Sequence, residues 1–204
     1  PEDFEKNWSQ QLRLSAYHAL LDELRAGGHL FACNKSRRDL APFEGRYPLE
    51  FREQNLDLDA PDVAWRVKTP RTEPPNMPED FVVRRRDGIP AYQIASLADD
   101  LHFGITHIIR GEDLAESTAA QQFLARCLGR EQFAETRFLH HPLLLDESGG
   151  KLSKSAGALA VKTIRENKSG PESLFLALVA WLGSSKSRMW TANDLLDLFR
   201  KIKI

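Results

Sequence analysis

Two lysines and two serines stand within five residues at Lys151-Leu-Ser-Lys-Ser155, directly after Gly149-Gly150. Glycines favour a loop, and two ammonium groups on a loop form a cationic clamp that suits the polyphosphate of a nucleotide. A solvated surface loop has the same composition, so the pentapeptide alone does not separate phosphate binding from simple exposure. We treat this segment as a candidate phosphate-binding loop.

A second polar group lies upstream, in His107-Ile-Ile-Arg-Gly-Glu-Asp113. Arg110 can bind a carboxylate through two parallel hydrogen bonds, which lysine does less well. An ion pair with an aspartate that holds the loop to the next helix fits the spacing equally well. Glu112 and Asp113 suit the first turn of that helix, where negative charge is favoured, and we do not assign them as acid–base catalysts. Together with His140-His-Pro-Leu-Leu-Leu145, these residues indicate ATP-dependent activation of an amino acid.

The elements around these motifs alternate as in an α/β sheet. Ile105–Ile109 is a β-branched apolar run of the kind found in buried parallel strands. Residues 117–128 predict an amphipathic helix, and residues 138–145 predict the next strand. We therefore predict a doubly wound α/β fold, in which ligands bind beyond the carboxyl ends of the strands. Arg110 directly follows one such strand.

The rest of the chain predicts helices and short strands. Leu12, Ala16, Leu20 and Leu24 recur at four-residue steps, with Tyr17 and Leu21 on adjoining positions, and predict one apolar helix face. The polar, proline-rich stretch from Pro42 to Pro78 indicates an inserted subdomain or a long excursion rather than a second core. Helices are predicted at 8–28, 36–40, 90–100, 117–128, 171–183 and 191–199. Ser9 is the expected N-cap of the first helix and Gly27-Gly28 end it, while Ser117 or Thr118 caps the helix at 117–128 and Gly129 is its C-cap. Strands are predicted at 30–33, 63–67 and 80–84, and a turn at 86–88.

The composition narrows the classes of protein. Hydrophobic content of 42% and charged content of 28% over 204 residues are ordinary for a globular protein. The formal net charge of -1 excludes a global basic field, so nucleic-acid binding requires a local patch such as Lys35–Arg38 or Arg84–Arg86, for which a solvated charged face is the alternative. No apolar run approaches the roughly 18 residues of a membrane helix. Cys33 and Cys127 are too few for a disulfide scaffold and fit a reducing cytoplasm.

The stretch from Asp80 to Leu182 resembles the glutamyl- and glutaminyl-tRNA synthetase family, the glutamate-type class I aminoacyl-tRNA synthetases. The resemblance implies a Rossmann-like parallel sheet with an inserted acceptor-type subdomain and a C-terminal helical region after the lysine loop. It assigns residues 1–32 and 80–150 to the nucleotide-binding fold, 33–79 to the insertion, and 151–204 to the loop and the last helices. The matching segments are 81–93, 107–113, 141–145 and 151–155, with 9–13, Tyr17 and 30–38 upstream.

The resemblance gives two residues a role in amino-acid binding. Tyr92 matches the tyrosine that lines the glutamate pocket, and Arg110 matches the arginine that binds glutamate there. Without the resemblance, Tyr92 would be interpreted as a core aromatic on a helix face.

The nucleotide site is assigned in the same way. Lys154 matches the second lysine of the signature loop, which neutralises the phosphates as pyrophosphate leaves, and Lys151 helps to hold the loop. A lysine on a flexible loop is physically suited to stabilising charge that develops on a leaving polyphosphate. His141 and Leu143 join Lys154 at ATP, and the expected cofactors are ATP and Mg²⁺. For His140 and His141, packing and hydrogen bonding near the adenine is favoured over metal or base chemistry.

Within the family, Asp113-Leu114 followed by Ser117-Thr118 resembles the short glutamyl-Q branch. The resemblance then implies activation of L-glutamate by ATP and transfer to queuosine in the anticodon of tRNA(Asp), by a cytoplasmic monomer without a membrane partner. An ordinary glutamyl-tRNA synthetase acting on tRNA(Glu), a non-catalytic tRNA- or nucleotide-binding relic, and a ligase of the same superfold with another substrate are the alternatives.

Two departures from the family pattern give further expectations. The HIGH-like motif, within Arg-x-Ala-Pro-Ser-Pro-Thr-Gly, is absent, and we expect that an N-terminal segment is missing and that the chain alone does not catalyse. The branch often carries Cys-x-Cys and Tyr-x-x-x-Cys as zinc ligands, but the aligned residues here are Cys33, Lys35, Tyr47 and Phe51. One thiolate, a lysine and a phenylalanine do not make a structural zinc site. We therefore predict no zinc at these positions, with the segment from Pro42 to Pro61 held by packing around Phe43, Tyr47 and Phe51 instead.

Overall fold

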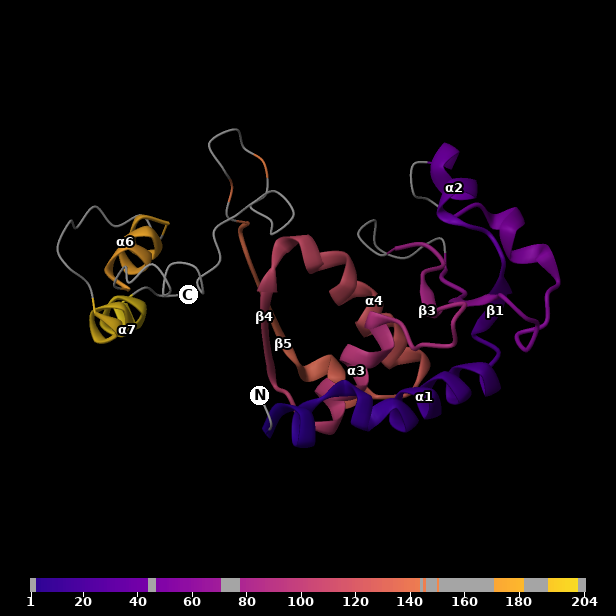
Figure 1. Cartoon of the computed structure of the whole chain (residues 1–204), viewed down its shortest axis with the longest axis horizontal. Coiled ribbons are helices and arrows are strands. Elements are labelled where there is room, and N and C mark those ends of the chain that lie inside the picture. Colours follow the sequence, from indigo (N-terminus) through magenta and orange to yellow (C-terminus); the bar gives the residue numbers. More distant parts are fainter. Residues whose placement is uncertain are drawn as a thin grey trace. The chain divides into compact units, whose positions relative to one another are not determined.

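The computed structural model describes residues 3–43, 47–70, 78–143, 145, 150, 171–181 and 191–201. The chain folds as two compact units, Pro1–Leu143 and Leu144–Ile204. The first is a mixed α/β unit that contains a parallel strand pair, as the sequence predicts (Figure 1). Among the described residues, none of the helices has the length and apolar character needed to cross a membrane.

Helices and strands occur close to the predicted places. The first unit contains α1 (Leu14–Ala26), β1 (Leu30–Cys33), α2 (Arg37–Leu40), β2 (Ala64–Val67), β3 (Val82–Arg84), α3 (Tyr92–His102), β4 (His107–Gly111), α4 (Ala115–Cys127) and β5 (Arg137–His141), with shorter helical segments at Phe4–Trp8, Gln10–Arg13, Ala41–Phe43, Leu49–Gln54, Glu112–Leu114 and Glu131–Glu135. The second unit contains α6 (Glu172–Trp181) and α7 (Ala192–Lys201).

The first three strands form an antiparallel sheet in the order β1-β2-β3. Leu30 pairs with Val67 and Cys33 pairs with Ala64, so the apolar strand β1 lies along the whole of β2. All four residues of β1 are buried, which explains why a short run without polar alternation forms a strand. The turn predicted after β3 is present, and Gly88 takes the φ of +84° that this turn requires.

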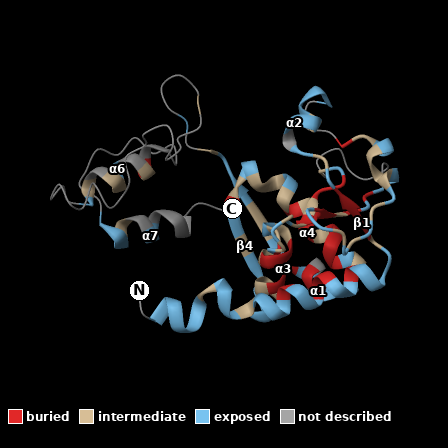
Figure 2. Cartoon of the chain, turned by 45° about the vertical axis from the view of Figure 1, so that its right-hand side comes forward, coloured by how far each residue is buried: buried red, intermediate tan, exposed pale blue. Residues whose placement is uncertain are grey.

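β4 and β5 pair in parallel, with His107 opposite Arg137 and Gly111 opposite His141. The predicted parallel arrangement is therefore confirmed, but the prediction that the first of these strands is buried is wrong. Ile109 is 70% exposed, and Figure 2 shows β4 mostly exposed or intermediate. Alternate residues of a strand point to opposite faces, and the buried residue of β4, Arg110, is hydrogen-bonded to α4.

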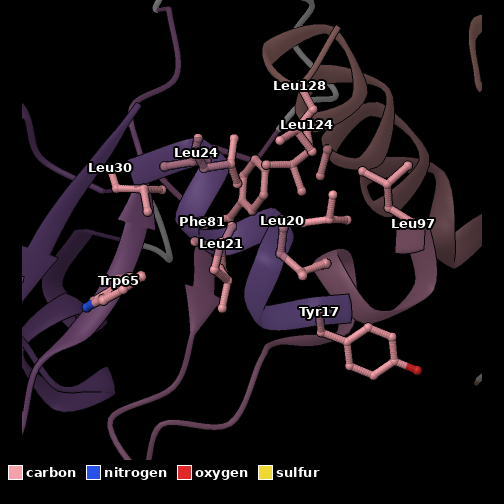
Figure 3. Close-up of a cluster of buried hydrophobic side chains, with 14 of the residues drawn as sticks. Tyr17, Leu20, Leu21, Leu24, Leu30, Trp65, Phe81, Leu97, Leu124 and Leu128 are labelled. Carbon is pink, nitrogen blue, oxygen red and sulfur yellow. The ribbon is translucent and has the colours of Figure 1, made fainter. Parts of the chain in front are cut away.

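One apolar core joins α1, α3 and α4 to the antiparallel sheet (Figure 3). Helix α1 contributes the predicted Tyr17, Leu20, Leu21 and Leu24, whereas Leu12 and Ala16 are exposed and do not belong to the core. Regular α-helix begins only at Leu14, after a 3₁₀ segment that contains Leu12, so the predicted four-residue step does not extend back to Leu12. The other main contributors are Leu30, Trp65, Phe81, Val83, Ile94, Leu97, Phe123, Leu124 and Leu128.

Helix ends follow the capping chemistry of the sequence, with one correction. Ser36 forms a capping box with Asp39, and Ser9 caps the 3₁₀ segment through the N–H of Gln11. Helix α4 begins at Ala115, before the predicted caps, and the hydroxyl of Thr118 instead donates to the carbonyl of Leu114 within the helix. Glu112–Leu114 already forms a 3₁₀ turn, which leads the chain into α4 without a side-chain cap.

Candidate functional site

The carboxyl ends of β4 and β5 lie side by side and are tied together just beyond the strands. The carboxylate of Glu112 accepts a hydrogen bond from the N–H of Leu143 at 3.2 Å. Gly111 lies close to the side chains of Asp113 and Leu143. A Cβ atom at this position would be 2.5 Å from Asp113 Oδ1 and 3.2 Å from Leu143 Cδ2. Parallel pairing thus brings Arg110, His141 and Leu143, which the sequence assigns to amino-acid and ATP binding, to one edge of the sheet.

Arg110 has a nearly buried guanidinium and only a neutral hydrogen-bond partner. The residue is 8% exposed, and its Nη2 donates to Gln121 Oε1 in α4 at 3.0 Å. The guanidinium carbon lies 4.9 Å from the centre of the Phe138 ring in β5. The predicted alternative, an ion pair with an aspartate, is not what holds Arg110 to the next helix; within the described part of the chain it forms no salt bridge.

Tyr92 is the first residue of α3 and is 52% exposed. The interpretation of this residue as a core aromatic is therefore wrong, and its ring remains available at the surface. The next residue, Gln93, donates from Nε2 to Ser117 Oγ in α4 at 3.2 Å. Ser117 and Gln121 are one helical turn apart on the same side of α4, so this one helix contacts both the start of α3 and Arg110.

The two adjacent histidines contact nearby polar groups. His140 Nε2 lies 2.8 Å from Thr118 Oγ1 in α4, and His141 Nδ1 lies 2.9 Å from the carbonyl oxygen of Pro142. Within the residues that the structure describes, no group of three His, Cys, Asp or Glu side chains is placed to hold a metal ion. The histidines therefore have polar contacts of the kind expected for an orienting role.

The predicted catalytic residues Lys151 and Lys154 lie outside the described residues, as does the rest of the 151–170 segment. Their roles remain predictions from the sequence.

Two cavities of about 310 and 330 Å³ are lined by residues near the ends of α3 and α4, including Arg126, Arg130, Asp100 and Thr106, and neither includes Tyr92 or Arg110. Within the described residues, the candidate site lies at the edge of the sheet where β4 and β5 end.

The four positions aligned with zinc ligands make direct contacts with one another. Tyr47 donates its hydroxyl proton to Cys33 Sγ at 3.0 Å, and the ammonium of Lys35 lies 4.9 Å from the centre of the Phe51 ring. Burial raises the pKa of the Cys33 thiol, but hydrogen bonds from Tyr47 and the N–H of Lys35 outweigh burial and leave the pKa below its usual value. A lysine and a phenylalanine at two of the four positions do not fit Zn²⁺.

Aromatic packing holds this region, as predicted. Phe31, Cys33 and Tyr47 form a small buried cluster against which Phe51 packs. The Phe43 and Phe51 rings meet edge to face with centroids 5.5 Å apart.

Sequence reasoning missed Gln121 and Gln93. Gln121 is fully buried on the face of α4 that carries Ala120, Leu124 and Ala125. A single amide among apolar residues on a buried helix face was the available signal, because a buried amide requires polar partners. The partner itself, Arg110, is identified only by the three-dimensional structure.

The sequence and the fold of this chain are both similar to those of known proteins. The family model for the catalytic domain of class I tRNA synthetases (E and Q) matches residues 58–202. The chain belongs to this family. The match includes the whole of α3, β4, α4 and β5, and therefore both Tyr92 and Arg110.

Relatives of the class I synthetase family are similar over about three quarters of the chain. The glutamyl-Q tRNA(Asp) synthetase of Synechococcus sp. (strain CC9605) is 39% identical over 165 residues, which are 77% of this chain and 53% of the relative. That of Pseudomonas fluorescens is 38% identical over 173 residues, which are 76% of this chain and 56% of the relative. The chain thus spans about half the length of the curated relatives it matches.

A solved structure supports the fold assignment. The crystal structure of glutamate-tRNA synthetase from Elizabethkingia anophelis superposes with a TM-score of 0.57 and 25% identity, covering 72% of this chain and 37% of that protein. The mixed α/β architecture with its parallel strand pair is therefore that of a class I synthetase catalytic domain.

Proposed function

We propose that this protein activates L-glutamate with ATP and transfers the glutamyl group to tRNA. The observation that carries the proposal is Arg110, a residue that is 8% exposed at the carboxyl end of β4 and forms no salt bridge within the described residues. A charge removed from water in this way calls for a counter-charge. A carboxylate of the amino-acid substrate supplies it, and the exposed Tyr92 at the start of α3 lines the same site.

Activation of an amino acid requires attack of its α-carboxylate on the α-phosphorus of ATP. One carboxylate oxygen forms the new P–O bond, and the bond to the leaving pyrophosphate breaks. Lys154 neutralises the negative charge that develops on the pyrophosphate, and Lys151 helps to hold the loop. His141 and Leu143 contribute to the ATP site at the edge formed by β4 and β5. Mg²⁺, when bound, neutralises the phosphates of ATP, and phosphate oxygens are among its preferred ligands.

The acceptor we favour is the queuosine base of tRNA(Asp). Support comes from the relatives at 35–39% identity, which are named glutamyl-Q tRNA(Asp) synthetase. The 3′ end of tRNA(Glu) is the second candidate, because the matching solved structure is a glutamate-tRNA synthetase. In either case the proposed site of action is the cytoplasm, and the proposed active form is a monomer without a membrane partner.

The first test is ATP–pyrophosphate exchange with L-glutamate on the purified full-length protein, with and without tRNA. By resemblance, the glutamyl-Q branch activates glutamate without tRNA, whereas an ordinary glutamyl-tRNA synthetase requires it. We expect exchange without tRNA, followed by transfer of labelled glutamate to tRNA(Asp) that contains queuosine. The matched control is tRNA(Asp) that carries guanosine at the same position.

Each outcome assigns the function differently. Exchange only in the presence of tRNA, with transfer to tRNA(Glu), would assign the ordinary enzyme. Absence of exchange with any amino acid, in protein that still binds tRNA or ATP, would overturn the proposal in favour of a binding protein without catalytic activity.

A further inference from the structure

Arg110 combines a permanent positive charge with burial and with an uncharged hydrogen-bond partner, while the carboxyl of Asp100 in α3 interacts with it electrostatically without forming a salt bridge. An arginine guanidinium stays protonated in proteins, so this charge is not removed by titration. Its polar contact is the amide oxygen of Gln121, and its Nε atom is buried without a hydrogen-bond partner in the described part of the chain. The local structure therefore positions the cation by a neutral amide, with no salt bridge among the described residues.

The contact with Arg110 fixes the orientation of the Gln121 amide. A guanidinium only donates hydrogen bonds, so the amide oxygen of Gln121 must face it, and the amide nitrogen must point elsewhere. That nitrogen, Nε2, is buried and has no partner within the described residues. Gln121 as a whole is 0% exposed. Arg110 Nε and Gln121 Nε2 are thus two buried donor nitrogens without a partner among the described residues. Two N–H donors beside one positive charge are complementary to a carboxylate.

Two contacts restrict the guanidinium from different sides. Gln121 in α4 binds Nη2 at 3.0 Å, and the Phe138 ring in β5 lies 4.9 Å from the guanidinium carbon. Bidentate binding of a carboxylate requires that the plane of the guanidinium is held in one orientation. The ring alone leaves the guanidinium free to turn in its own plane, and the amide of Gln121 removes this freedom.

We propose that Gln121 is a positioning residue that presents the charged guanidinium of Arg110 to a carboxylate of the amino-acid substrate. This inference rests on the proposed function and deepens it, because it assigns a role in substrate binding to a buried residue of α4. An uncharged partner is essential to the role. A carboxylate at position 121 would hold Arg110 equally firmly but would neutralise the charge that the substrate needs.

The test is a pair of substitutions that separate holding Arg110 from presenting its charge. Gln121→Met keeps the length and unbranched shape of the side chain and removes the amide. Gln121→Glu keeps an oxygen acceptor in the same place and adds a negative charge. Gln122→Met is the matched control, since it makes the same change at the next residue of α4, which is only partly buried. The readout is the KM for glutamate and for ATP in the exchange assay on the full-length protein.

We expect Gln121→Met to raise the KM for glutamate about tenfold and Gln121→Glu to raise it about a hundredfold, with the KM for ATP within twofold of wild type. Gln122→Met is expected to behave as wild type. If Gln121→Glu keeps the wild-type KM for glutamate, Gln121 merely supports the fold and the inference is overturned. An unchanged KM for glutamate in Gln121→Met overturns it as well.

The same series separates this inference from the proposed function. The role of Gln121 concerns a carboxylate, which every amino acid carries, so the KM comparison is made with whichever amino acid supports exchange. Exchange with another amino acid, combined with the expected effects at position 121, would overturn the assignment to glutamate and support the positioning role. Normal exchange with glutamate in all variants would support the assignment to glutamate and overturn the positioning role. Absence of exchange with any amino acid overturns both.

Discussion

Tyr47 and Cys33 are joined directly, with the tyrosine hydroxyl 3.0 Å from the sulfur. The hydroxyl of Tyr47 also lies 3.1 Å from the carbonyl oxygen of Phe51, and the Phe51 ring faces the ammonium of Lys35. The four positions at which the resemblance places zinc ligands are therefore close to one another. Hydrogen bonding and a cation–π contact join them.

The double substitution Lys35→Cys, Phe51→Cys is expected to create a zinc site. Three thiolates and the phenolic oxygen of Tyr47 would then surround one position, a donor set that suits tetrahedral Zn²⁺. We predict about one zinc per chain by elemental analysis, and a melting temperature that falls when a chelator is added. Wild type and each single variant are expected to hold no zinc and to ignore the chelator. Stoichiometric zinc in the wild-type protein would contradict this account.

Asp99→Asn is expected to lower the free energy of unfolding at pH 7 by about 2 kcal/mol. Asp99 accepts hydrogen bonds from Arg13 at 2.7 Å, Tyr17 at 2.6 Å and Gln10 at 2.9 Å. Burial raises the pKa of Asp99, but these hydrogen bonds outweigh it and leave the pKa below 3.8. Since the pKa of Asp99 is lower in the folded protein, its contribution is present above the unfolded value and is lost as the pH falls through the folded value. Denaturation by urea at pH 7 and pH 3 measures the difference.

The neighbouring residue provides a control with the opposite sign. Burial raises the pKa of Asp100, and the guanidinium of Arg110 only partly offsets this. Stability from a carboxyl with a raised pKa is lost as the pH rises, so Asp100→Asn is expected to leave the protein at least as stable at pH 7. Equal destabilisation by both substitutions would contradict the assignment of the two environments.

Asp80→Asn is expected to destabilise the fold by about 3 kcal/mol. Asp80 is fully buried, forms an ion pair with Arg52, and accepts hydrogen bonds from the N–H and hydroxyl of Thr69. It has a φ of +43°, which asparagine also tolerates, so the substitution changes the charge without adding backbone strain. Thermal unfolding measures the effect. Asp59→Asn removes the exposed ion pair with Arg25 and should cause no measurable change.

Lys154→Ala is expected to lower the kcat of ATP–pyrophosphate exchange by about a hundredfold, with little change in the KM for glutamate. The reason is that the proposed role of Lys154 is in the transition state, where charge develops on pyrophosphate. Lys151→Ala is expected to have a smaller effect, because its proposed role is to hold the loop. Steady-state kinetics at saturating glutamate measure both. A larger loss in Lys151→Ala would reverse the two assignments.

Local chemistry along the chain was sufficient to predict most elements. The apolar run of β1 and the capping box at Ser36 depend on residues that are neighbours in sequence, and so does the turn at Gly88. The roles of Tyr92 and Arg110 in amino-acid binding are predictions that rest on the resemblance to the family. Predictions that depend on neighbours in space were less accurate: Leu12 and Ala16 do not face the core, and Ile109 is exposed.

The sequence by itself determined the family, because family membership is a property of residue type and order. It also predicts which residues bind the amino acid and the nucleotide. Only the tertiary structure decided what surrounds them. It pairs Arg110 with the neutral amide of Gln121, eleven residues along the chain. It also joins Cys33 to Tyr47 through a hydrogen bond across fourteen residues. Packing between elements that are distant in sequence brings these partners together, and electrostatics at a buried charge depends on distance in space rather than on separation along the chain.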